Sequence, residues 1–106
     1  MTAERSIEVH ALHWRGVDFE ITFERDWLSI VREHDLAASH LTVTTLQPKR
    51  APLPITETGY RSQFLHAIDV DAAGGPVAYV EAWLRAMGQS LEWLAYEQNR
   101  RQLSLF

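Results

Sequence analysis

The chain has 106 residues, no cysteine, a formal net charge of −4 and 46% hydrophobic residues. This length fits one domain, the hydrophobic fraction suffices for a core, and the lack of cysteine excludes disulfides and thiolate metal sites. An acidic chain lacks the basic face that displaces counterions from nucleic acid, so we expect no direct nucleic-acid binding. No N-terminal apolar run resembles a secretion signal, and no stretch approaches the roughly 20 apolar residues that span a bilayer, so we expect a cytoplasmic protein without membrane contact.

Two alternating runs predict an N-terminal antiparallel hairpin over residues 6–24. In the first run, IEVHAL, Ile7, Val9 and Ala11 alternate with Glu8, His10 and Leu12. In the second run, VDFEITFE, four apolar residues alternate with acidic and threonine residues. A short segment that contains Gly16 joins them, as is typical of a hairpin. We therefore expect a sheet with one apolar face and one acidic, solvated face.

The middle of the chain predicts a helix, two further strands and a long loop. Asp26 is suited to cap a short helix that runs through Val31. The threonine-rich run HLTVTTL predicts a third strand over residues 40–46. The segment QPKRAPLPITETGYRS has three prolines and no periodicity, which predicts a loop over residues 47–62. The run FLHAIDV then predicts a fourth strand that ends at Asp69–Asp71.

The C-terminal part predicts two helices. Pro76, after two glycines, suits the first turn of a helix. Apolar residues then follow at spacings of three and four, which predicts a core face made of Val77, Val80, Leu84, Met87, Leu91 and Leu94. Gly88 suits a helix end and Ser90 an N-cap, which favours a break over one continuous helix. The expected fold is α+β, a single domain over residues 1–101 in which C-terminal helices pack on an antiparallel sheet of about four strands.

The sequence shows no pattern of catalytic or metal-binding residues. His10 and His13 lie three apart in a predicted strand, so they point to opposite faces and cannot share a metal ion without a bulge. No HExxH spacing, phosphate loop or nucleophile elbow is present. We therefore expect a protein that is not an enzyme and that holds no metal and no cofactor.

The segment from Lys49 to Arg61 is a candidate anion site. Its cations, hydroxyls and the backbone around Gly59 could together hold an anion such as a phosphate; the candidate residues are Lys49, Arg50, Thr56, Thr58, Tyr60 and Arg61. In the alternative interpretation, the loop is a solvated connector that Tyr60 anchors on the sheet.

The chain ends in QLSLF, residues 102–106. This segment resembles the pentapeptide, approximately Q-L-S/D-L-F, by which bacterial proteins dock on the DNA polymerase sliding clamp. The resemblance implies that Gln102 hydrogen-bonds at a polar subsite, Leu103 packs on its rim and Ser104 faces outward. Leu105 and Phe106 would fill an apolar pocket of the clamp. The chain would then be a small adaptor that binds the clamp through its tail and a second partner through its body.

The alternative is that the apolar tail folds back and completes the core, so that the protein is an anion- or ligand-binding module that uses the loop over residues 49–61. The sequence leaves a homo-oligomer open. A wider resemblance joins PLPITETGYRSQFL, GGPVAYVEAWL and the RQLSLF end, which together are similar to small bacterial proteins associated with plasmids and other mobile elements. That resemblance covers about half of the chain and implies no particular activity, but it favours a role linked to replication.

Overall fold

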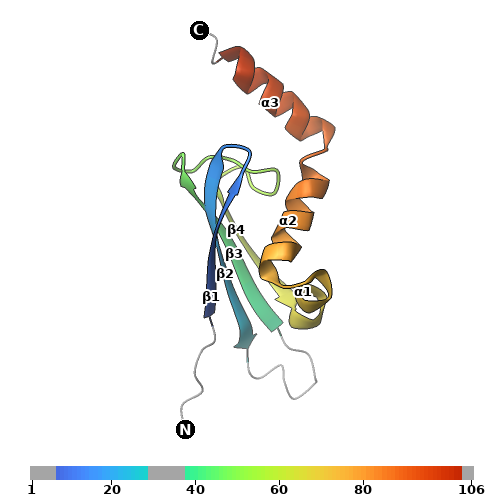
Figure 1. The fold of residues 1–106 in the computed structure, drawn as a ribbon. Coiled ribbons are helices and arrows are strands. Elements are labelled where there is room, and N and C mark those ends of the chain that lie inside the picture. The colour runs from blue at the N-terminus through green and yellow to red at the C-terminus, as the bar shows by residue number, and fades with distance from the viewer. Residues whose placement is uncertain (1–6, 29–37, 104–106) are drawn as a thin grey trace.

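The computed structural model describes residues 7–28 and 38–103. This part of the chain forms one four-stranded antiparallel sheet and three helices (Figure 1). The strands are β1 (Ile7–Trp14), β2 (Val17–Leu28), β3 (Ala38–Gln47) and β4 (Tyr60–His66). The helices are α1 (Ala67–Ala73), α2 (Pro76–Met87) and α3 (Leu91–Leu103). The strands lie in the order β1-β2-β3-β4, each antiparallel to its neighbour, which confirms the predicted α+β class.

The predicted hairpin forms the first half of the sheet. Trp14 pairs with Val17 across a two-residue turn, in which Arg15 and Gly16 have φ angles of 43° and 84°. Positive φ at both central residues matches the twist of the two strands, so this turn sets the register. All four apolar residues of the second run are at most 2% exposed and form the core face, namely Val17, Phe19, Ile21 and Phe23.

Helices α1 and α2 cover the core face of the sheet, and no described helix covers the other face (Figure 1). The uncovered face carries the predicted acidic and threonine residues of β2, but it is not purely polar. Ile7 and Val9 of β1 lie on it and are 47% and 57% exposed. Leu12 and Trp14, on the opposite face of β1, are the residues that pack against the core.

The predicted helix that begins at Asp26 is wrong where the structure describes it. Strand β2 continues to Leu28, which pairs with Ala38 of β3 beyond an irregularity in the register. Sheet pairing with β3 therefore decides the backbone conformation here over the local capping signal of Asp26. Residues 29–31, the rest of the predicted helix, lie outside the described residues.

The predicted fourth strand is displaced along the chain. Strand β4 begins at Tyr60, inside the predicted loop, and ends at His66, so the residues AIDV belong to helix α1 instead. Ala67 and Val70 are both buried, three residues apart, as one face of a helix requires. Gly74 ends α1 with a φ of 106°, a left-handed conformation that favours glycine.

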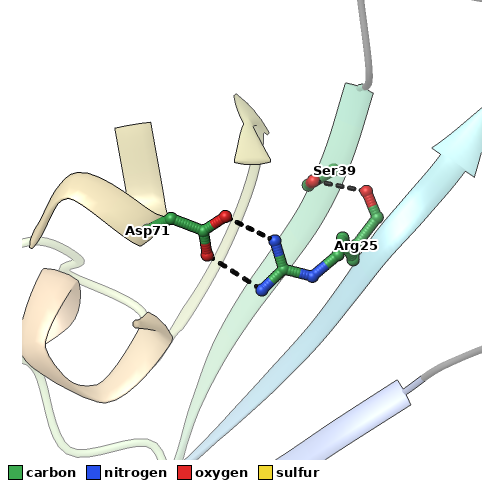
Figure 2. A network of polar contacts seen from close by, with 3 residues as sticks. All are labelled: Arg25, Ser39 and Asp71. Carbon is green, nitrogen blue, oxygen red and sulfur yellow. Dashed lines mark hydrogen bonds and ion pairs between the residues drawn. The ribbon is translucent and has the colours of Figure 1, made fainter. Parts of the chain in front are cut away.

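An ion pair ties α1 to the sheet (Figure 2). The Arg25 guanidinium of β2 donates to both carboxylate oxygens of Asp71 at 2.9 and 3.0 Å, and the Ser39 hydroxyl donates to the Arg25 carbonyl. The hydrogen bonds from Arg25 lower the pKa of the Asp71 carboxyl below its usual value. This bidentate pair joins residues 46 positions apart and connects α1 to β2 at the surface.

The segment between β3 and β4 is a loop, as predicted, but three of its side chains belong to the core. A cis peptide bond joins Gln47 to Pro48. Beyond it, Ala51, Leu53 and Ile55 are at most 8% exposed and belong to the core cluster. The backbone groups of Leu53 and Thr56 exchange two hydrogen bonds of 2.9 Å. This segment closes the end of the core rather than crossing the surface as a solvated connector.

The break between the C-terminal helices lies where it was predicted. Pro76 opens α2, Gly88 follows its last residue, and the Trp93 amide of α3 donates to the Ser90 hydroxyl at 3.1 Å. The predicted apolar stripe is wrong beyond Leu84. Val80 and Leu84 are fully buried, whereas the last three residues of the stripe, Met87, Leu91 and Leu94, are 41%, 85% and 46% exposed. Among the described residues, no helix is long and apolar enough to cross a membrane.

Candidate functional site

A pocket of about 790 Å³ lies where the segment after β3 meets the break between α2 and α3. One wall is the segment from Pro52 to Glu57, together with Arg61 of β4. The other wall comes from the end of α2 and the first turns of α3, through Met87, Ser90, Glu92, Trp93 and Tyr96. We call this the PLP pocket, where the letters stand for the Pro52–Leu53–Pro54 sequence in its wall and not for pyridoxal phosphate.

Alternation along the first wall places prolines at the pocket. Leu53 and Ile55 are buried in the core, while Pro52 and Pro54, between and beside them, are only half-buried. Proline favours an extended backbone and donates no hydrogen bond, so the two rings add apolar surface to this wall without an unpaired amide. The sequence carried a signal for this arrangement, because apolar residues recur at every second position from Ala51 to Ile55.

Contacts between tilted aromatic rings hold the second wall in place. The Trp93 ring lies 5.8 Å from that of Trp14 and 4.9 Å from that of Tyr96, between ring centroids. Gly88 permits this approach, since a Cβ there would lie 3.0 Å from the Trp14 ring and 2.8 Å from the Leu84 carbonyl oxygen. The hairpin turn adds a further contact, an ion pair of 3.0 Å between Arg15 and Glu97. The start of α3 is therefore fixed to the sheet at this end.

One polar group in the pocket wall is buried without a partner. Trp93 is 8% exposed, and its indole N–H makes no hydrogen bond in the described structure. A buried donor without an acceptor costs about 1–3 kcal/mol, so a molecule that brought an acceptor to this N–H would gain from it. Sequence reasoning missed both Trp93 and Tyr96, because neither lies in the apolar stripe that marked the helix face.

The charges that line the PLP pocket are two carboxylates and one guanidinium. Glu57 and Glu92 supply the carboxylates. Arg61 lies 5.3 Å from the centroid of the Trp83 ring and donates to the Ile55 carbonyl at 3.4 Å and to the Gln63 side-chain oxygen at 3.1 Å. The cation is thus held against the protein by three contacts, and the lining is net negative.

The six residues of the predicted anion site do not form one cluster of free cations and hydroxyls. The hydroxyls of Thr56 and Thr58 donate to the Tyr60 carbonyl at 2.7 and 3.3 Å, so their protons are already used within the loop. Tyr60 and Arg61 are successive residues of β4 and therefore point to opposite faces of the sheet. Lys49 and Arg50 are exposed in the turn after β3. Of the six, Thr56 and Arg61 line the PLP pocket.

Helix α3 extends beyond the end of the sheet (Figure 1). It runs from Leu91 to Leu103, so the predicted boundary between domain and motif at residues 101 and 102 falls inside its last turn. Trp93 is buried, but none of the described α3 side chains from Leu94 to Arg100 is. The described part of α3 beyond Trp93 therefore adds nothing to the core. Ser104, Leu105 and Phe106 lie outside the described residues.

His10, His13 and His40 each lie within hydrogen-bonding distance of a polar side chain. His13 lies 2.6 Å from the Asp18 carboxylate and His40 lies 2.6 Å from the Ser62 hydroxyl, measured between the bonded atoms. His10 lies 3.2 Å from Glu8, on the opposite face of β1 from His13. Within residues 7–28 and 38–103, no group of three histidine or carboxylate side chains is placed to hold a metal ion.

Comparison with known proteins identifies a family model that matches the chain. The family model described as the KlcB third domain matches residues 7–93, from the first residue of β1 to the buried tryptophan of α3. Neither the curated proteins nor the solved structures contain a match to the chain. The matched span covers the whole sheet, α1 and α2, and it leaves out most of α3. Because this match extends over most of its length, the chain belongs to the family of the KlcB third domain.

Proposed function

We propose that this protein is a small non-enzymatic adaptor that docks on the bacterial DNA polymerase sliding clamp through Gln102–Phe106. The observation that carries the proposal is the exposure of α3 beyond Trp93, where none of the described side chains is buried. Leu103 lies ten positions after Trp93, which corresponds to about 15 Å of helix. We infer that a peptide which follows such a helix is accessible to a partner.

The energetics suit a reversible contact. Burial of Leu103, Leu105 and Phe106 on a partner would gain about 5–9 kcal/mol before costs. Gln102 and Leu103 belong to the last turn of α3, and an extended bound form would require this turn to open. Terminal helical turns open with little loss of free energy, so the main unfavourable term in the binding free energy is the ordering of the peptide. We expect a net affinity in the micromolar range, at about −6 to −8 kcal/mol.

Titration calorimetry of the full chain against purified sliding clamp tests the proposal. The double variant Leu105→Ala/Phe106→Ala should abolish the heat of binding, because these two side chains would supply most of the buried apolar surface. Ser104→Ala is the matched control and should bind as the unaltered chain does, since this position faces outward in the motif. If the unaltered chain gives no heat at tens of micromolar, the proposal is wrong.

A second candidate function is an anion-binding module that uses Lys49, Arg50 and Arg61. The observation in its favour is that Arg61 and Thr56 line a pocket. The carboxylates of Glu57 and Glu92 in the same lining oppose an anion there, which is why we rank this function second. Phosphate or a nucleotide should raise the melting temperature of the chain if it binds the folded state, and the triple variant Lys49→Ala/Arg50→Ala/Arg61→Ala should remove that rise.

A further inference from the structure

The PLP pocket and the C-terminal segment of the same chain have complementary chemistry. The pocket is walled by proline, leucine, isoleucine and two aromatic rings, and its lining includes the carboxylates of Glu57 and Glu92. The segment RRQLSLF offers the opposite charges in Arg100 and Arg101, followed by three large apolar side chains. An apolar peptide that begins with two cations therefore suits an aromatic pocket with excess negative charge.

A chain cannot place this whole segment in its own PLP pocket while α3 stays helical. Leu103 lies about 15 Å along the helix from Trp93, and the three residues after it span at most about 10 Å when extended. Arg100 and Arg101 are themselves in α3, eight and nine positions after the pocket residue Glu92 and therefore about 12 and 13 Å along the helix from it. The helix cannot return them to the pocket wall at its own start without unwinding.

We propose that the PLP pocket receives the segment Arg100–Phe106 of a second copy of the chain. Two copies related by a two-fold axis can exchange their segments reciprocally, so that each α3 lies across the partner and both pockets are filled. The apolar side chains pack between Pro54 and Trp93, and a carbonyl or the Gln102 side chain accepts the unpartnered indole N–H of Trp93. The arginines pair with Glu57 and Glu92 at the rim.

This exchange does not depend on clamp binding, but it would regulate it. Gln102–Phe106 cannot occupy the partner's pocket and a clamp at the same time, so the dimer would withhold the pentapeptide from the clamp. Dilution of the protein should then raise the apparent affinity for the clamp, because it increases the fraction of chains with a free segment. Self-association can be measured with no clamp present, so failure of either proposal is distinguishable from failure of the other.

Sedimentation velocity on the full chain, from about 1 μM to about 1 mM, tests the exchange directly. We expect a reversible monomer–dimer equilibrium in that range. A pocket variant, Glu57→Arg/Glu92→Arg, and a segment variant, Arg100→Glu/Arg101→Glu, should each self-associate at least about tenfold more weakly, because each puts like charges together. Mixed in equal amounts, the two variants should form a heterodimer, since each pocket then meets a segment of opposite charge.

The control variant is Glu81→Arg, which changes an exposed acidic residue of α2 outside the pocket lining and should dimerise as the unaltered chain does. Thermal melts establish that every variant is folded before it is compared. A chain that stays monomeric at about 1 mM would overturn the proposal. So would a dimer that tolerates both charge reversals, which would indicate another surface, or a mixture of the two variants that stays monomeric.

Discussion

The sheet with α1 and α2, and the part of α3 beyond Trp93, are stabilised by different means. In the first region, twelve buried residues form one cluster that includes side chains from β2, β3, α1, α2 and the segment before β4. In the second, the described side chains from Leu94 to Arg100 contribute none. Leu94 directly follows Trp93 in the same helix, yet Trp93 is 8% exposed and Leu94 is 46% exposed. A continuous helix can therefore begin as part of a core and continue as a solvated extension.

This difference has consequences for how α3 is stabilised. An isolated helix of about 13 residues is marginal in water, because its nucleation is costly. The Ser90 cap, the tilted contact between the Trp93 and Trp14 rings and the Arg15–Glu97 ion pair fix α3 from its first turn to Glu97. We infer that the helix is most stable near Trp93 and opens most readily near Leu103, where the proposed docking segment begins. The predictions below test this contrast between the two regions, from the largest expected effect to the smallest.

The largest effect is expected in the core cluster. Phe19 is 1% exposed, and Phe19→Ala should lower the free energy of unfolding by about 3–5 kcal/mol, because it leaves a cavity. Leu94→Ala is the control in the part of α3 beyond Trp93, where the side chain is 46% exposed and the change should stay within about 0.5 kcal/mol. Denaturant melts of both variants measure this, and similar losses would show that the two regions do not differ as described.

An intermediate effect is expected at the junction between the two regions. A Cβ at Gly88 would lie 2.8 Å from the Leu84 carbonyl oxygen and 3.0 Å from the Trp14 ring, so Gly88→Ala must displace one of them. We expect a loss of about 1–3 kcal/mol, as overpacked sites show. The tryptophan fluorescence should also change, because the Trp14–Trp93 contact shifts. An unchanged spectrum together with unchanged stability would contradict the close packing of this junction.

A smaller and pH-dependent effect is expected at the surface ion pair between Arg25 and Asp71. The pKa of Asp71 is lowered in the folded state, so the pair stabilises the fold above the unfolded pKa of about 4 and loses that contribution as the pH falls through the folded value. Asp71→Asn should therefore melt below the unaltered protein at pH 7, and the gap should close in acid. A gap that is the same at both pH values would show that charge is not its cause.

The smallest effect on stability is expected at the C-terminus. Deletion of Gln102–Phe106 should leave the melting temperature nearly unchanged at about 1 μM, a concentration chosen to keep copies apart. The same deletion should remove both clamp binding and self-association. If the deletion lowers the melting temperature by several degrees at this dilution, the segment packs on its own body, and α3 is not the solvated extension that its described side chains indicate.

Local patterns were sufficient to predict part of this fold. Alternation from Val17 to Phe23 identified the core face of β2, and Pro76, Gly88 and Ser90 identified where α2 begins, where it ends and where α3 is capped. Each of these signals depends on residues within a few positions of one another, because turns, caps and strand periodicity are set by the backbone nearby. The pentapeptide was found in the same way, and its role stays a prediction.

Other features depended on contacts between distant segments. Strand pairing extended β2 to Leu28. The ion pair between Arg25 and Asp71 joins β2 to α1, a helix whose residues the sequence predicted as the end of a strand. The exposure of Leu91 and Leu94, which continue the apolar spacing of α2, likewise depends on what packs against α3 rather than on the local pattern. The PLP pocket brings together residues from Pro52 to Tyr96.

The amino-acid sequence by itself determined the periodic elements and their caps, because these depend on short-range interactions. The tertiary structure alone decided which apolar residues are buried and which side chains share a pocket, because burial depends on what packs from elsewhere in the chain.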